Sequence, residues 1–439
     1  MKDKDSINNE EVLLEKTDRE DLKAAPIKTI TLNHHKQASL IKVIYLGVLF
    51  LFCRSTFVSY SNMISQIYHQ EGYTYLGTIS VVCVWVAFAL NSLLFAQNIL
   101  QYISLKAALM ICSMNFPIVT ITGVYGSGCE GSYSNLCNPA LVYFVVIICS
   151  LICGSMGAVL WMSQAGYLSL SAPPEKLPFY IGIFFALNQS SQITANLLSL
   201  FALGEVSQFH YFIILFCIAL FFSFLFVMIP SVEKPIKKKF TVKENLAKIK
   251  ELMKKSRIQI LSVYFTSTGV CIGFYTGYLY LLIEESLESG LSRSEVNVKT
   301  SYVFILLGVC SFFAGLICGK LAGKVSLNRL MMMSIIFLEA SIIASMFAFY
   351  TKSYALCFIS GGLWGFTDSF FTTLTNILVK IECGNGLEGY VILRFCMGIG
   401  FLVTCVLSMG LSGHSNYAFL LIIFILQMIS MGVVLELKS

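Results

Sequence analysis

The chain has 439 residues, of which 56% are hydrophobic and 12% are charged, and its formal net charge is +6. Together with a mean hydropathy of +0.77, this composition excludes an ordinary water-soluble globular protein and indicates a membrane protein. The excess of Lys and Arg does not indicate nucleic-acid binding, because these residues gather beside apolar segments, where lipid headgroups would lie.

Apolar segments occupy most of the chain from Leu40 to Val434, and each is about as long as the roughly 20 residues that a membrane-spanning helix needs. Six of them precede a lysine-rich segment at Glu233–Arg257 and six follow it. The sequence therefore predicts an all-α membrane protein with twelve transmembrane helices. The predicted spans are Leu40–Tyr60, Tyr75–Phe95, Ile103–Tyr125, Ala140–Met162, Pro178–Leu203, Tyr211–Ile229, Ile258–Leu282, Tyr302–Leu321, Leu330–Tyr350, Ala355–Val379, Val391–Leu411 and Ala418–Val434.

The distribution of basic residues predicts the orientation of these spans. Outside the spans, nearly all Lys and Arg residues fall on the side of the N-terminal tail, and only Arg293, Lys299 and Lys352 fall on the other side. Because basic loops stay in the cytoplasm, both termini are predicted to be cytoplasmic. The tail contains no apolar core of a signal peptide, so residues 1–37 are predicted to be a disordered cytoplasmic tail.

Two groups of six spans joined by a cytoplasmic linker are the arrangement of the major facilitator fold, in which two halves related by pseudo-two-fold symmetry rock about a site at the midplane. The predicted domains are the tail (1–37), an N-terminal six-helix half (38–230), a basic linker (231–257) and a C-terminal six-helix half (258–436).

Within the linker, the segment Thr241–Lys255 places Val242, Leu246, Ile249 and Met253 on one face of a helix, with lysines elsewhere around it. This pattern predicts a basic amphipathic helix that lies on the inner leaflet. A solvated linker that only satisfies the charge rule is the alternative.

Most of the 15 cysteines lie within predicted spans, where a cysteine behaves as a small apolar residue. Cys129 and Cys137 instead lie in a loop on the predicted exoplasmic side, where a disulfide is favoured by the oxidising compartment. Either a disulfide or two free thiols fits this position. The cysteines and the five histidines show no metal-ligand or catalytic-triad spacing, so no metal, cofactor or enzymatic activity is expected.

Two ladders of glycines repeat at intervals of four residues. Such small residues let transmembrane helices approach closely, and the ladders are therefore predicted to be packing faces, either static or sliding during a conformational change. They comprise Gly269, Gly273 and Gly277 in the seventh span, and Gly315, Gly319 and Gly323 in and just after the eighth.

Ionisable side chains inside a membrane are costly and are candidates for a functional site. Arg54, Glu339 and Asp368 lie within predicted spans, and the first and tenth spans, which carry Arg54 and Asp368, line the cavity in the facilitator topology. Asp368 continues a polar stripe with Trp364 and Thr372 on one helix face. An ion pair between Arg54 and Asp368 is predicted. Hydrogen bonds to neighbouring polar side chains are the alternative for each.

Amides and a tryptophan add to this candidate cavity. The fifth span carries Asn188 and Gln192 on one stripe, with Gln189 beside it, and the fourth carries Trp161 and Gln164. Amides in hydrocarbon must find partners, either across a helix interface or in a wet cavity. Packing is the alternative for Trp161.

Several of these motifs resemble one family. The run GAVLWMSQAGYLS at residues 157–169 resembles the fourth-span signature of the uncoordinated-93-like (UNC-93-like) family, a branch of the major facilitator superfamily. Tyr180–Leu198 resembles the fifth-span pattern, with Ala195 where the family has Gly. Gly365–Ser369 resembles the tenth-span Gly-x-x-Asp-Ala/Ser motif, but Thr372–Leu374 replaces the Asn-Thr-Gln triplet that usually follows.

This resemblance implies a facilitator fold in the plasma or endolysosomal membrane. It also implies a transporter-like protein or a regulatory subunit, because members of the family are associated with regulating potassium channels and escorting receptors. The expected partners are the lipid bilayer, an ion channel or receptor, and a small-molecule or ion substrate. The alternative is a secondary active transporter, a uniporter or cation-coupled, that moves a small solute through a central cavity.

Overall fold

The computed structural model describes residues 32–70, 72–73, 75–129, 135–202, 206–232, 240–288, 290–384, 386–411 and 416–435. The chain divides into two units, Met1–Ser39 and Leu40–Ser439, and the second contains the helical bundle. The predicted tail lies outside the described residues except for its end, because the first described helix begins at Leu32.

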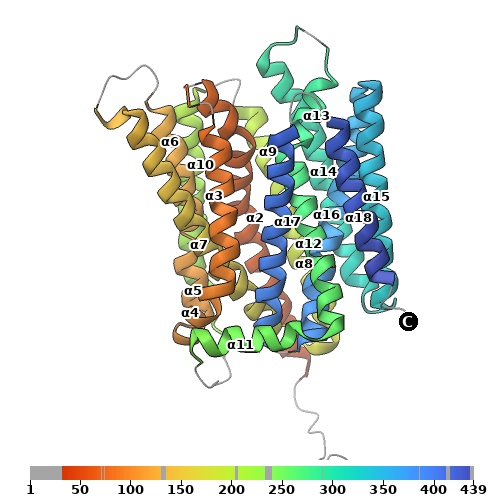
Figure 1. The fold of residues 1–439 in the computed structure, drawn as a ribbon. Helices are drawn as coiled ribbons and strands as arrows, with labels where there is room; N and C mark the ends of the chain where they lie inside the picture. The colour runs from red at the N-terminus through yellow and green to blue at the C-terminus, as the bar shows by residue number, and fades with distance from the viewer. Residues whose placement is uncertain are drawn as a thin grey trace, which may run out of the picture. The chain divides into compact units, whose positions relative to one another are not determined.

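Every regular element in the described ranges is helical, which confirms the predicted all-α fold (Figure 1). The helices before the linker are α2 (Leu32–Gln70), α3 (Leu76–Asn91), α4 (Gln97–Tyr102), α5 (Leu105–Cys112), α6 (Asn115–Ser127), α7 (Pro139–Ser171), α8 (Leu177–Gln189), α9 (Ser191–Ala202) and α10 (Gln208–Leu225). Those from the linker onward are α11 (Val242–Met253), α12 (Ser256–Gly277), α13 (Leu279–Glu285), α14 (Arg293–Leu321), α15 (Leu327–Thr351), α16 (Tyr354–Cys383), α17 (Glu388–Leu411) and α18 (Asn416–Leu435). The remaining described elements are a short π-helix, η2 (Ser92–Ala96), and three short 3₁₀ helices, η3 (Asn135–Cys137), η4 (Pro174–Lys176) and η5 (Phe226–Met228).

In the described part of the chain, 10 helical segments are long and apolar enough to cross a membrane. The two other predicted spans have different forms. Pro178–Leu203 is divided at Ser190 between α8 and α9, and Ala355–Val379 lies within α16, whose inner face carries many buried Ser, Thr and Asn side chains. Both are amphipathic because they turn polar faces towards the interior of the bundle.

Helices from the two sides of the linker pack against each other along two seams. In one seam α3 lies beside α17, seen as orange beside blue in Figure 1, and Trp85 stacks on Phe401 with ring centroids 4.2 Å apart. In the other, α8 and α9 lie beside α14, and α8 also contacts α16. These seams leave a space between the two sets of helices, and some of the predicted site residues line it.

The helix α11 lies across one end of the bundle (Figure 1) and begins at a capping box formed by Thr241 and Glu244. Its buried side contacts α4 and α17, with Ile249 buried and Asn245 donating a hydrogen bond to Asn98. Val242, predicted to share the apolar face, is instead 37% exposed. Protein therefore covers part of this face, and contact with the inner leaflet stays a prediction.

Candidate functional site

A cavity of about 120 Å³ lies between the two sets of helices. Its wall is supplied by α2, α3, α6, α7, α8 and α9 from before the linker and by α12, α16 and α17 from after it. Much of the wall is apolar and aromatic, including Trp85, Phe88 and Trp161, and it is interrupted by a few charged and amide side chains. A mostly apolar pocket with a small number of polar groups is the usual form of a small-molecule site.

A smaller polar cavity of about 40 Å³ shares Asn62 and Thr276 with the first. It is lined further by Tyr280 and Asn297, which are joined by a hydrogen bond of 3.2 Å. Tyr280 belongs to α13, which lies at the end of the bundle opposite α11 (Figure 1). The two cavities therefore adjoin at Asn62 and Thr276, and the smaller, polar one extends to the helix at that end.

The predicted direct ion pair between Arg54 and Asp368 is wrong, because an amide lies between the two charged groups. The Gln189 Oε1 atom accepts a hydrogen bond from Arg54 Nη1, and Gln189 Nε2 donates one to Asp368 Oδ2. Thr372 Oγ1 donates a longer bond of 3.5 Å to Asp368 Oδ1, and Arg54 Nη2 lies 3.5 Å from the Tyr275 hydroxyl. One glutamine on α8 therefore connects opposite charges that are carried by α2 and α16.

The structure places four of the predicted cavity residues in the wall and four outside it. Arg54, Trp161, Gln192 and Thr372 line the cavity. Asp368 is 1% exposed and lies behind Gln189.

Gln164, Asn188 and Trp364 are corrections to the predicted cavity, because all three are buried in helix packing. Trp364 stacks on Phe274 with centroids 4.0 Å apart and donates its indole hydrogen to Ser345 over 2.8 Å. Gln164 and Asn188 are fully buried, and no hydrogen bond joins either amide to another described side chain.

Arg394 is the cavity residue that the sequence analysis missed. It is 1% exposed, lines the cavity, and has its guanidinium carbon 5.1 Å from the centre of the Trp161 ring. Its Nη2 atom donates a hydrogen bond of 3.2 Å to Asn376. The predicted span began at Val391, which assigned Arg394 to the basic end of a helix. The helix begins earlier, at Glu388, and carries Arg394 nearly two turns inward.

The glycine ladders form two close helix contacts. A Cβ atom on Gly269 would lie 1.9 Å from the Met397 carbonyl oxygen, so α12 approaches the α17 backbone there, and one on Gly319 would lie 2.8 Å from the Gly182 Cα atom. Gly273 and Gly315 make similar approaches to Thr404 and Ala186. The last member of each predicted ladder does not belong to it, because a Cβ atom on Gly277 or Gly323 would meet nothing closer than 3.9 Å. Gly277 is the last residue of α12, and Gly323 lies beyond the end of α14.

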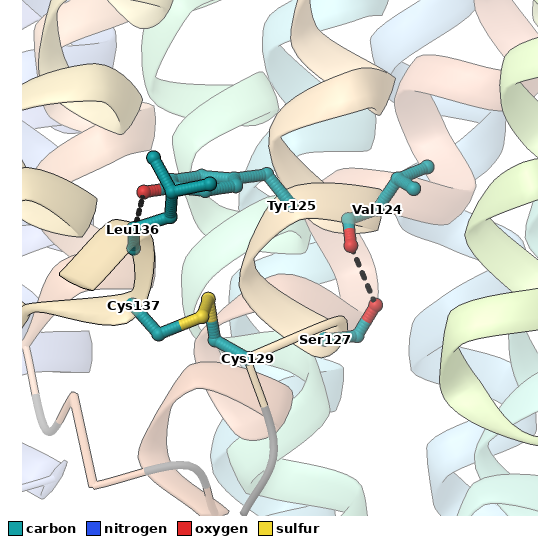
Figure 2. Close-up of a disulfide and its surroundings, with 6 residues drawn as sticks. All are labelled: Val124, Tyr125, Ser127, Cys129, Leu136 and Cys137. Carbon is teal, nitrogen blue, oxygen red and sulfur yellow. Dashed lines mark hydrogen bonds between the residues drawn. A yellow bond between two sulfur atoms is a disulfide. The ribbon is translucent and has the colours of Figure 1, made fainter. Parts of the chain in front are cut away.

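Cys129 and Cys137 form a disulfide, with their Cα atoms 5.3 Å apart (Figure 2). Beside it, Tyr125 donates a hydrogen bond to the Leu136 carbonyl oxygen. The bond and the tyrosine both tie η3 to the end of α6, away from the cavity. In the described part of the chain, no three His, Cys, Asp or Glu side chains gather as a metal site would require.

Comparison with known proteins agrees with this architecture. The family model described as Major Facilitator Superfamily matches residues 132–392. The chain is 21% identical to the human protein named Protein unc-93 homolog A, over 90% of this chain and 92% of that protein. A crystal structure of a D-xylose-proton symporter superposes with a TM-score of 0.65 and 14% identity, covering 91% of this chain and 97% of the symporter. The symporter establishes likeness of fold alone. The chain belongs to the major facilitator superfamily, and its predicted resemblance to the UNC-93-like branch is confirmed by the human relative.

Proposed function

We propose that the protein carries a small solute across the membrane through the cavity between its two six-helix halves, residues 38–230 and 258–436. The observation that supports this most strongly is the wall of the cavity, which draws charged and amide side chains from both halves. Ionisable residues within a membrane carry a desolvation cost. A bundle that served only as a scaffold would not need to turn Arg54, Gln192 and Arg394 towards an internal space.

The contacts between the halves suit relative movement. Gly182 and Gly319 bring α8 and α14 together backbone to backbone, without interlocking side chains. Alternating access in this fold is a rocking of one half against the other around a fixed site. The distribution of basic residues supports cytoplasmic termini, in a plasma or endolysosomal membrane, and the smaller cavity beside Tyr280 would then lie towards the exoplasmic side.

The test uses a substitution that fills the cavity and leaves the outer surface of the protein unchanged. Gly157 lines the cavity, and a Cβ atom there would meet no atom closer than 3.4 Å, so Gly157→Trp projects an indole into the space. Vesicles that contain the purified protein are incubated with a cell extract, and the solutes they accumulate are identified by mass spectrometry. We expect the wild type to accumulate at least one solute and Gly157→Trp to accumulate none.

The matched control is Gly432→Trp, because Gly432 is exposed on α18 and has no atom within 4 Å of its Cβ position. This variant should behave as the wild type. Folded protein that gives the same solute profile as empty vesicles would contradict transport. In that case, a channel or receptor that co-purifies in stoichiometric amount would instead support the accessory role that the UNC-93-like resemblance implies.

A further inference from the structure

Arg394 is a buried cation whose partners are all neutral. Its Nη2 atom binds the Asn376 amide oxygen over 3.2 Å, its Nη1 atom lies 3.9 Å from the Met397 sulfur, and its guanidinium faces the Trp161 ring. No described residue accepts a hydrogen bond from its Nε atom. A guanidinium keeps its charge in proteins, so this site holds a positive charge that no neighbouring carboxylate offsets.

Three carboxylates on α16 and α17, the helices that carry Asn376 and Arg394, have other partners; one of them, Glu388, lies 4.0 Å from Lys248. Asp368 is linked through Gln189 to Arg54, and Glu382 forms a bidentate ion pair with Arg257 at 2.6 and 2.7 Å. Among the described residues of the cavity wall, Arg54 and Arg394 are the charged side chains. The negative charge of Asp368 balances the positive charge of Arg54, so the charge of Arg394 is the one that remains unbalanced at the cavity.

The surroundings of this charge define what would complement it. Trp161 and Met397 lie against the guanidinium, and Phe88 adds to the apolar wall of the same cavity. The planar fork of an arginine matches a carboxylate or sulfonate in a bidentate manner. A single excess charge is neutralised by one negative charge, and a larger anion charge would leave a new imbalance in a low-dielectric space.

We propose that the cavity binds an organic monoanion, a carboxylate or sulfonate with an apolar or aromatic body, and that Arg394 holds its anionic group while the Trp161 wall covers the body. This inference deepens the proposed transport function by naming the substrate class, and it shares the same cavity.

The test measures binding rather than transport. Purified protein in a neutral detergent and a dilute Tris-chloride buffer, which contains no organic anion, is titrated with benzoate, benzamide and benzylammonium. Intrinsic fluorescence is the readout, because two of the three tryptophans, Trp85 and Trp161, line the cavity. Benzoate should bind, and the neutral and cationic analogues should not. Arg394→Gln should weaken benzoate binding by about tenfold or more, the usual effect of losing a hydrogen bond to a charged group, and Arg394→Lys should weaken it less.

Thermal unfolding separates binding from folding. Because Arg394 has no carboxylate partner, Arg394→Gln without ligand should be at least as stable as the wild type, whereas benzoate should stabilise the wild type alone. Arg329→Gln, which removes an exposed arginine on α15, is the matched control and should bind benzoate normally.

Equal binding of benzoate and benzamide, or unchanged benzoate binding by Arg394→Gln, would overturn the proposal. Benzoate binding without any vesicle uptake would leave the anion site standing and remove the transport function. Uptake of neutral solutes without benzoate binding would leave the transport function standing and remove the anion site.

Discussion

Gln189 is the side chain on which the polar centre of the bundle depends. It accepts from Arg54 and donates to Asp368, and so lets two opposite charges interact across a distance that neither side chain spans alone. Both ends of an amide are used, which few other residue types offer. Asp368 is 1% exposed, so water cannot replace a hydrogen bond that it loses. The link between the two charges therefore depends on one uncharged residue, Gln189.

Replacing this amide by an apolar group of similar size should destabilise the protein. Gln189→Leu removes a hydrogen bond from the buried Asp368 carboxylate, and an unsatisfied buried polar group costs about 1–3 kcal/mol, more when charged. The midpoint of thermal unfolding in detergent should fall. Gln259→Leu, at an exposed glutamine on α12, should leave it unchanged. Equal midpoints for wild type and Gln189→Leu would show that the bridge does not form.

The sequence identified the residue types of this centre but not their pairing. Arg54 and Asp368 were predicted from the rarity of ionisable residues within apolar spans, and Thr372 from its place on the same helix face as Asp368. Which amide connects them depends on the rotation of α8 about its axis, and that rotation is set by the packing of α8 on α14 and α16. Arg394 was missed because the predicted span began at Val391, three residues after the observed start of α17 at Glu388. That difference was enough to make a buried arginine look like one at the membrane surface.

At the scale of elements, glycines determine how closely helices approach. The prediction that the two ladders are packing faces was made from spacing alone, and the structure places Gly319 against the Gly182 backbone. Spacing could not show where each ladder ends, because it does not show that α12 ends at Gly277 and α14 ends before Gly323.

Gly319→Ala should disturb the seam between the halves. The added Cβ atom would lie 2.8 Å from the Gly182 Cα atom and 2.9 Å from the Pro178 carbonyl oxygen, both backbone atoms that do not move without shifting α8. Overpacking of this kind costs about 1–3 kcal/mol. Thermal unfolding should show the loss, whereas Gly323→Ala, one helical turn away, should have no effect because its Cβ atom has a clear 4.0 Å. Similar midpoints for the two variants would contradict this contact.

The disulfide at the end of α6 gives a prediction that requires no functional assay. Thirteen of the 15 cysteines are free thiols, so protein unfolded in detergent should react with maleimide at 13 positions before reduction and at 15 after it. Cys129→Ser should raise the number before reduction to 14, by releasing Cys137. The same variant should lose about 2–3 kcal/mol of stability, the value expected for a short closed loop. Fifteen reactive thiols without reduction would show that the bond is absent.

At the scale of the whole molecule, hydropathy and charge were sufficient to predict an all-α membrane protein, because the bilayer demands long apolar helices. The same rules assign the helices to two groups of six. They do not specify which helices meet across the groups. The seams of α3 with α17 and of α8 with α14 arise from shape, as in the stacking of Trp85 on Phe401, and hydropathy does not record shape.

The central claim is that an organic anion passes through the cavity at Arg394, and exchange of labelled benzenesulfonate across vesicle membranes tests it most directly. This probe remains charged, so it crosses lipid slowly without a carrier. Vesicles loaded with unlabelled benzenesulfonate and containing the wild type should take up the label well above empty vesicles. Vesicles with Arg394→Gln or Gly157→Trp should match empty ones. Folded wild-type protein that exchanges no more label than empty vesicles, or an Arg394→Gln variant that exchanges as fast as the wild type, would contradict the claim.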